Sequence, residues 1–429
     1  MKKEELNKEL IAASSVNNFV NVKHLLKLGA DVHTKDDKPI KEASQWGYLD
    51  TVKLLVKHGA DIHAEDDLSI RYASNNGHLD VVKFLIKSGA NIHADDDCSL
   101  RSASKSGHLK IAEFLIKSGA DVQADDNCSI RFASIGGYLD IVKLLIKNGA
   151  DIHVRSDGPF RYASRIGHLD IVKLLIKSEV DIHADDDFAF RYATKNGHLD
   201  IVKLLIKSGV DIHVHSDTTL KCASQYGHLD IVNLLIKHGA DVHSDDDLSI
   251  RYASKNGHLD VVKLLIKFGA DINVTCYEST ASPIMLAVQN DYPDIVKFLI
   301  DIGADIHSCY DSPIIMASRC ESTQCMKLLL DAGVDVHVAN DMPLRLASMC
   351  GNLNTTKLLL ENGADVHAQD ESPLEHATYL GYTKVVKLLL EYGADETKIK
   401  IKSVFMSKEE ISKEHEEYLK RFWQNVTKN

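Results

Sequence analysis

The chain of 429 residues contains no long apolar run. Its apolar segments, such as IVKLLI, are interrupted by lysine and are far shorter than the ~20 apolar residues of a membrane span. The first residues, MKKEELNKEL, are charged and no apolar core follows them, so we expect no secretory signal. The eight cysteines form no CxxC pair and no short disulfide framework, which predicts reduced thiols in an intracellular, cytoplasmic protein.

An excess of basic residues is also missing. The net charge of −12 argues against nucleic acid as a partner, because few cations are left over to neutralise phosphates. The sequence has no nucleophile elbow, phosphate-binding loop or HExxH motif. A catalytic site is one asymmetric cluster, whereas this chain offers the same residues many times over. We therefore predict a protein that is not an enzyme, needs no cofactor and does not bind membranes.

What the chain does have is a repeat of 30 residues between positions 41 and 270. Within residues 161–187, RYASRI precedes Gly167, and LDIVKLLIK follows with apolar residues at helical spacing. A glycine such as Gly149 or Gly209 usually ends this second segment, and an extended, polar DIHADDD leads to the next unit. The pattern predicts an all-α repeat solenoid of about 13 helix-turn-helix units, each packed on its neighbours.

These residues resemble the ankyrin repeat. Gly77-His78, Val81-Val82, Leu85-Ile86 and Gly89-Ala90 match family motifs, and Ser282-Pro283-Ile284 is among the closest counterparts of the T-P-L-H motif. The resemblance implies short turn or β-hairpin fingers between units. It also implies a non-enzymatic, monomeric scaffold that binds a protein partner through its concave, finger-lined face.

The period of 30 is shorter than the 33 residues of the family, and the missing residues fall in the finger. We therefore expect stubby turns, with a fuller finger only at residues 271–284, where the spacing grows to 34. This shortened form also resembles the Mimivirus-like ankyrin proteins of large DNA viruses of amoebae. That resemblance implies a viral protein that interacts with its host, in the host cytoplasm.

Three regions are expected from this pattern. Residues 1–30 form an N-terminal capping repeat, residues 31–395 the repeat array, and residues 396–429 a C-terminal helical cap or tail. Ser407 to Glu410 has capping-box spacing, which predicts a helix to about Trp423. This helix is either a cap or a docking peptide. The alternative function is an adaptor that uses this helix to couple a bound target to a ubiquitin ligase or another effector.

Histidine invites a metal hypothesis, because the chain has 22 histidines and most of them fall in two ladders. One ladder follows glycine, as at His78 and His108, and the other precedes the finger, as at His63 and His93. Equivalent positions on stacked helices lie ~8–10 Å apart, whereas zinc ligands lie ~2 Å from one ion. Both ladders are therefore read as scaffold, and the resemblance makes the first a hydrogen-bonding residue of the turn. The second could add some sensitivity to acid.

Runs of aspartate such as Asp95-Asp96-Asp97 lie close to an arginine ladder that includes Arg71 and Arg101. Two interpretations stay open. Arginine and aspartate of neighbouring units could pair and stiffen the turn edge, or the charged face could steer a basic partner. A zinc site at Cys320, Cys325 and Cys350 is disfavoured, because their spacing fits no standard pattern.

The resemblance places partner contacts at the finger tips and at the two residues before each Gly-His. These pairs vary between otherwise similar units. They are Gln45-Trp46, Asn75-Asn76, Lys105-Ser106, Ile135-Gly136, Arg165-Ile166, Lys195-Asn196, Gln225-Tyr226 and Lys255-Asn256. Exposed aromatic, arginine and aliphatic groups dominate interface energies. The predicted anchors are Trp46, Ile135, Arg165, Ile166 and Tyr226, together with Phe188, Phe190 and Tyr277 of the fingers.

One unit departs from the helix-ending glycine. Glu179 stands where the others have glycine, and Val180 stands where most have alanine. If the backbone at position 179 keeps the left-handed conformation, the substitution costs about 1 kcal/mol.

Overall fold

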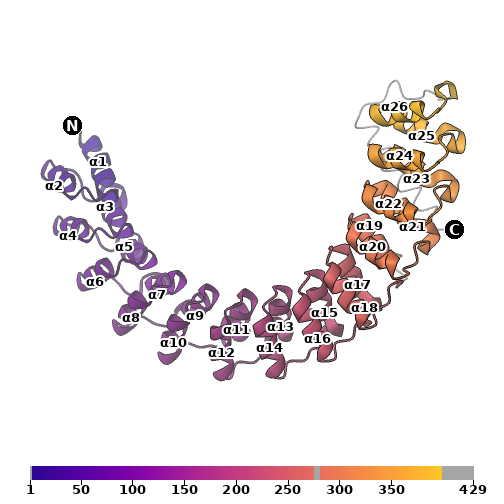
Figure 1. Cartoon of the computed structure of the whole chain (residues 1–429). Helices are drawn as coiled ribbons and strands as arrows, with labels where there is room; N and C mark the ends of the chain where they lie inside the picture. Colours follow the sequence, from indigo (N-terminus) through magenta and orange to yellow (C-terminus); the bar gives the residue numbers. More distant parts are fainter. Residues whose placement is uncertain (1, 275–280, 399–429) are drawn as a thin grey trace. The chain divides into compact units, whose positions relative to one another are not determined.

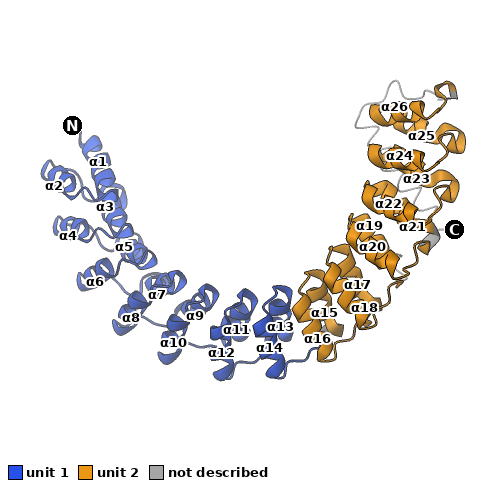
Figure 2. Cartoon of the chain, viewed as in Figure 1, with its two compact units in different colours: residues 1–214 blue, residues 215–429 orange. Residues whose placement is uncertain are grey.

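The structure is a computed structural model that describes residues 2–274 and 281–398. The chain divides into two compact units, residues 1–214 and 215–429 (Figure 2). In each unit, short helices follow one another in pairs (Figure 1). The described residues contain no strand, and none of their helices is long and apolar enough to cross a membrane.

The first unit contains α1 (Lys3–Ser15), α2 (Phe19–Lys27), α3 (Thr34–Gln45), α4 (Leu49–Lys57), α5 (Ala64–Asn75), α6 (Leu79–Lys87), α7 (Ala94–Ser106), α8 (Leu109–Lys117), α9 (Ala124–Gly136), α10 (Leu139–Lys147), α11 (Val154–Ile166), α12 (Leu169–Lys177), α13 (Ala184–Lys195) and α14 (Leu199–Lys207). α15 (Val214–Gln225) begins at Val214, the last residue of this compact unit.

The second unit continues with α16 (Leu229–Lys237), α17 (Ser244–Lys255), α18 (Leu259–Lys267), α19 (Pro283–Gln289), α20 (Pro293–Asp301), α21 (Ser308–Cys320), α22 (Thr323–Asp331), α23 (Val338–Cys350), α24 (Leu353–Glu361), α25 (Ala368–Tyr379) and α26 (Thr383–Glu391). A 3₁₀ turn, η1 (Glu396–Lys398), is the last described element. The paired helices confirm the predicted all-α repeat solenoid.

The second helix of each pair is short and amphipathic. In α6, Val81, Val82 and Leu85 are buried, while Lys83 and Lys87 face solvent. Full burial of such side chains contributes roughly 1.5–3 kcal/mol each. The helix ends at Lys87, and Gly89 follows in the turn with a φ of 101°, which glycine adopts without strain. Each repeat, which is one pair of helices, thus supplies one apolar layer to the core.

The first helix of each pair carries small residues where it meets its neighbours. In α5, Ile70 is fully buried, and so are the small residues Ala73 and Ser74. Small side chains allow helix axes to approach closely, which is how the first helices stack from one unit to the next. Within each compact unit, the core therefore lies in a row between successive helix pairs, as a solenoid requires.

The connection between units is a left-handed turn and not the extended segment that the sequence predicted. Glu65, Asp66 and Asp67 have φ angles of 52°, 53° and 57° at the start of α5. Aspartate visits this region more readily than most residues, because its short side chain bonds locally. The conformation accounts for the aspartate runs, because these residues carry the left-handed turn. The fuller finger expected at 271–284 falls largely on residues 275–280, outside the described residues.

The last residue of each turn links two units through a buried carboxylate. Asp67 accepts a hydrogen bond from His63 Nδ1 (3.1 Å) and another from the backbone N–H of Asn91 in the next unit (2.8 Å). Asn91 Oδ1 in turn accepts from the N–H of His93 (3.0 Å), which begins the same pattern again. Asp37, Asp97 and Asp247 make equivalent bonds. The second histidine ladder is thus part of the scaffold.

Glu179 is a non-glycine residue in a left-handed backbone conformation, which strains the turn at the end of α12. Its φ is 65°, so the left-handed backbone is kept without glycine. The following hydrogen bond, from Val180 N to Leu175 O, is 3.4 Å long, against 3.0 Å for the bond from Ala150 to Leu145.

We predict that Glu179→Gly raises the melting temperature by about 1–2 °C, because a left-handed non-glycine residue costs roughly 1 kcal/mol. Glu179→Ala keeps the Cβ and should give no rise. Calorimetry of the two variants measures the difference, and equal melting temperatures would show that the turn is not strained.

Candidate functional site

The first helix of each repeat ends in a pair of residues at the same place on the surface. We call this place the helix-end surface and define it by the eight residue pairs from Gln45-Trp46 to Lys255-Asn256 that precede each Gly-His or Gly-Tyr. Each pair lies at the end of a first helix, and at least one member of each is exposed. Because the pair changes from unit to unit on an otherwise regular frame, this surface is where the chain presents different chemistry.

The Gly-His histidines bind the backbone of this surface and leave its side chains free to vary. His78 Nε2 donates to the carbonyl of Gln45 (2.9 Å), and His108 Nε2 donates to that of Asn75 (3.0 Å). The same bond joins His168 to Ile135, His198 to Arg165 and His258 to Gln225. These contacts confirm that the first histidine ladder is structural.

Glycine is required on the other side of this contact. The His108 ring lies against Gly77 of the preceding unit, and a Cβ on Gly77 would meet its Cε1 at 2.8 Å. The φ of Gly77 is 85°, which also disfavours any other residue. The Gly-His motif is therefore a contact between units: the glycine of one unit receives the histidine of the next.

Most of the predicted anchors lie open to solvent on the helix-end surface. Trp46 is 52% exposed and Tyr226 is 43% exposed, and Ile135 and Ile166 are also exposed. Arg165 is exposed, with its guanidinium 5.8 Å from the centre of the Tyr192 ring. The apolar area of these side chains stays in contact with water unless a partner covers it.

Two aromatic residues predicted as finger anchors have a different place. Phe190 is fully buried in the core, so its prediction as an anchor was wrong. It occupies the position of Ile70 and Leu100, which the apolar period assigns to the inner side of the first helix. Phe188 is partly buried and stacks on Tyr192 at 4.0 Å between ring centres. Tyr277 lies outside the described residues.

Sequence reasoning missed an aromatic row beside this surface. Tyr72, Phe132, Tyr162 and Tyr192 occur at the same place in their units, and Tyr72 is exposed. Lys105 lies over the Phe132 ring (5.5 Å), which holds the cation in place beside the helix-end surface. The signal was present in the recurring RYAS segment, but its aromatic residue had been assigned to scaffold.

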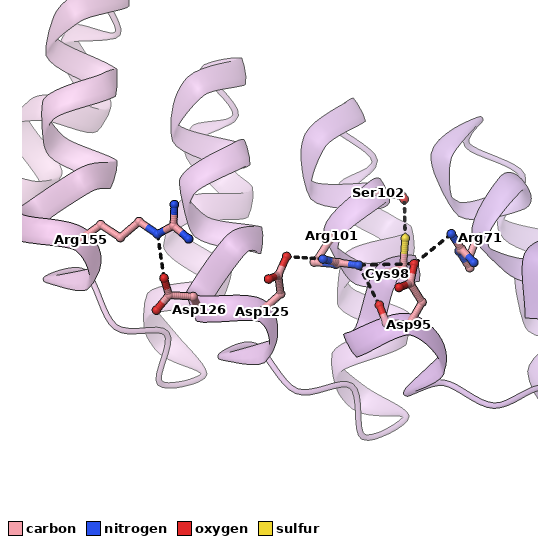
Figure 3. Close-up of polar contacts among 8 residues, drawn as sticks. All are labelled: Arg71, Asp95, Cys98, Arg101, Ser102, Asp125, Asp126 and Arg155. Atoms are coloured by element: carbon pink, nitrogen blue, oxygen red, sulfur yellow. Dashed lines mark hydrogen bonds and ion pairs between the residues drawn. The ribbon is translucent and has the colours of Figure 1, made fainter. Parts of the chain in front are cut away.

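Arginine and aspartate pair between units along the turn edge (Figure 3). Arg71 contacts Asp95 of the next unit (2.9 Å), and Arg101 contacts Asp125 one unit further. The hydrogen bond from Arg101 holds the pKa of Asp125 below its usual range. The predicted pairing of arginine with aspartate between neighbouring repeats is confirmed. Steering of a basic partner by the charged face stays a prediction.

Among the six cysteines that the structure describes, the thiols are not activated. Burial raises the pKa of Cys325 and of Cys350, which keeps both thiols protonated. Within residues 2–274 and 281–398, no group of three or more His, Cys, Asp and Glu is arranged to hold a metal ion. What the described surface offers is binding chemistry: exposed apolar groups, cations and amides on a rigid frame.

Comparison with protein families gives two matches. The family described as Ankyrin repeats (3 copies) matches residues 70–156, 160–246, 248–310 and 314–400, and the one described as Ankyrin repeats (many copies) matches residues 40–86. Among curated proteins, none is significantly similar to the chain.

The second histidine ladder makes a prediction about pH. The hydrogen bond and the charge of Asp247 raise the pKa of His243, so protonated His243 stabilises the fold. This stabilisation is complete below the ordinary pKa of histidine and is lost as the pH rises through the raised pKa. His243→Gln should therefore lower the melting temperature more at about pH 6 than at about pH 8.5. His58→Gln, at a residue with no described partner, is the control, and a pH-independent effect of His243→Gln would contradict the prediction.

Proposed function

Since the chain belongs to the ankyrin-repeat family, we propose that it is a non-enzymatic scaffold that binds a protein partner through the helix-end surface. Ankyrin repeats generally mediate protein–protein interaction. The observation that carries the proposal is the division of roles at the end of each first helix. The histidine of the next repeat binds only a backbone carbonyl there, and side chains such as Trp46 and Ile135 remain exposed beside it.

The nature of the exposed groups supports this surface over the others. Trp46, Ile135, Ile166 and Tyr226 present apolar area that no described residue covers fully. The second helices instead present mostly lysine and aspartate, as in α12, where Lys173 pairs with Asp170 at 3.3 Å. Exposed ion pairs of that kind contribute little to binding, whereas tryptophan, tyrosine and arginine are the usual anchors of interfaces.

The finer parts of the proposal go beyond the family. From the shortened period alone, we propose a viral protein that acts as a monomer in the cytoplasm of an amoebal host. The adaptor alternative, with a ubiquitin ligase as effector, depends on residues 407–423, which lie outside the described residues. No observation of the described residues favours that alternative.

We predict that Trp46→Ala and Tyr226→Ala, tested singly, each weaken the affinity for a partner captured from the native cell by about tenfold, as loss of an interface anchor does. Titration calorimetry with the purified partner measures the change. Phe268→Ala removes an aromatic side chain of similar exposure from the end of the second helix α18 and should leave the affinity unchanged. Unchanged affinity in both test variants, or an equal loss in the control, would contradict the proposed surface.

A further inference from the structure

Two arginines of residues 1–214 have no carboxylate 24 positions later: Arg131, and Arg191, which has His215 there. Four other first-helix cations pair with the residue 24 positions later: Lys41 with Glu65, Arg71 with Asp95, Arg101 with Asp125, and Arg161 with Asp185. For Arg131 the residue 24 positions later is Arg155. A carboxylate is thus replaced by a second cation.

The structure does not supply another partner for Arg131. Arg155 turns back to Asp126 and contacts it at 2.7 Å (Figure 3). The nearby carboxylate Asp125 is engaged by Arg101. Arg131 itself makes no hydrogen bond or ion pair with a described residue. Burial raises the pKa of Cys128, so that thiol adds no negative charge. Arg71, Arg101 and Arg155 each contact a carboxylate directly, whereas Arg131 has only the longer-range attraction of Asp125.

Glycine at position 158 leaves the arginine side chain without an aromatic cover. A Cβ on Gly158 would lie 3.8 Å from Arg131 Cδ, 3.7 Å from Arg155 Cβ and 3.9 Å from Tyr162 Cε2, so these three side chains surround it. One unit further on, the same position is Phe188, and Arg161 lies over its ring at 5.0 Å. Arg131 therefore lacks both the carboxylate and the ring that Arg161 has.

We infer that the Arg131 side chain binds a carboxylate of the protein partner. The carboxylate belongs to an Asp or Glu in an extended segment of that partner. The inference rests on the proposed function and adds the chemistry of the partner. A guanidinium binds a carboxylate through two parallel hydrogen bonds, the geometry that the ladder satisfies internally elsewhere. The partner's carboxylate would replace the one that position 155 does not provide.

The surrounding charge favours a single carboxylate over a polyphosphate. Exposed Asp96, Asp126 and Asp186 lie at the same place in neighbouring turns, in a chain whose net charge is −12. A nucleic-acid strand brings a phosphate at every nucleotide and would meet these carboxylates along the edge. A peptide can place one carboxylate at Arg131 and uncharged residues beside the neighbouring turns.

The test uses two fluorescent peptides of equal length, one with Glu at alternate positions and one with Gln there, together with an oligothymidylate. Fluorescence anisotropy at low ionic strength measures binding to the full chain. We expect tighter binding of the Glu peptide than of the Gln peptide, and a loss of about tenfold for Arg131→Gln, which removes a charge-assisted contact. Arg71→Gln, at an arginine that already has Asp95, is the matched control and should keep the affinity within about twofold.

Arg155→Asp provides an independent readout. This substitution gives Arg131 a carboxylate 24 positions later, as Arg101 has in Asp125. It should therefore abolish the preference for the Glu peptide and raise the melting temperature. Arg155→Ala removes the same cation without adding a carboxylate and should not raise the melting temperature.

The inference is overturned if the two peptides bind equally, if the oligothymidylate binds more tightly than the Glu peptide, or if Arg131→Gln has no effect. It is also overturned if Arg155→Asp fails to raise the melting temperature. If a captured partner is weakened by Trp46→Ala but not by Arg131→Gln, the proposed function stands and only the carboxylate position is wrong.

Discussion

The buried carboxylate at the end of each left-handed turn is the interaction on which the rest of the structure depends. Asp67 and its equivalents take three consecutive non-glycine residues through a conformation that costs about 1 kcal/mol or more for each. The cost is offset because the carboxylate accepts one bond from a histidine of its own unit and one from the backbone of the next. Where Asn127 replaces it, the inter-unit bond remains at 2.7 Å. The short connection and the stacking of units thus have one common cause.

Once the repeats are joined in this way, stacking uses the backbone of each helix end, and the proposed recognition uses exposed side chains there. The histidine of one unit holds the backbone of the preceding helix end, and its ring fills the space that Gly77 and its equivalents leave. Side chains such as Trp46 and Arg165 take no part in that contact, so they can change without loss of the fold. Along the turn edge, the ion pairs of Arg101 and Arg161 are both present although Arg131, between them in the array, has no such pair.

The sequence predicted the fold closely and the connections poorly. Apolar residues at helical spacing and the glycine after LDIVKLLIK indicate the helix pairs, because burial and helix termination are local properties. Asp95-Asp96-Asp97 was read as charge, whereas the structure uses these residues for backbone conformation and buries the third. Phe190 was misplaced because it was counted with the finger when it belongs to the helical period. No local pattern reveals that Arg131 faces Arg155, since their pairing follows from the stacking of units.

The most direct measurement compares Asp97→Ala with Asp96→Ala in chemical unfolding. Both aspartates lie in the same left-handed turn, with φ angles of 55° and 50°, so alanine costs the backbone a similar amount at either position. Only Asp97 is buried, at 4% exposure, and only it accepts from His93 and from the N–H of Asp121. Asp97→Ala should lower the free energy of unfolding by about 2–3 kcal/mol more than Asp96→Ala, because it removes two hydrogen bonds to a buried, charged acceptor. Equal losses would show that the carboxylate does not join the units.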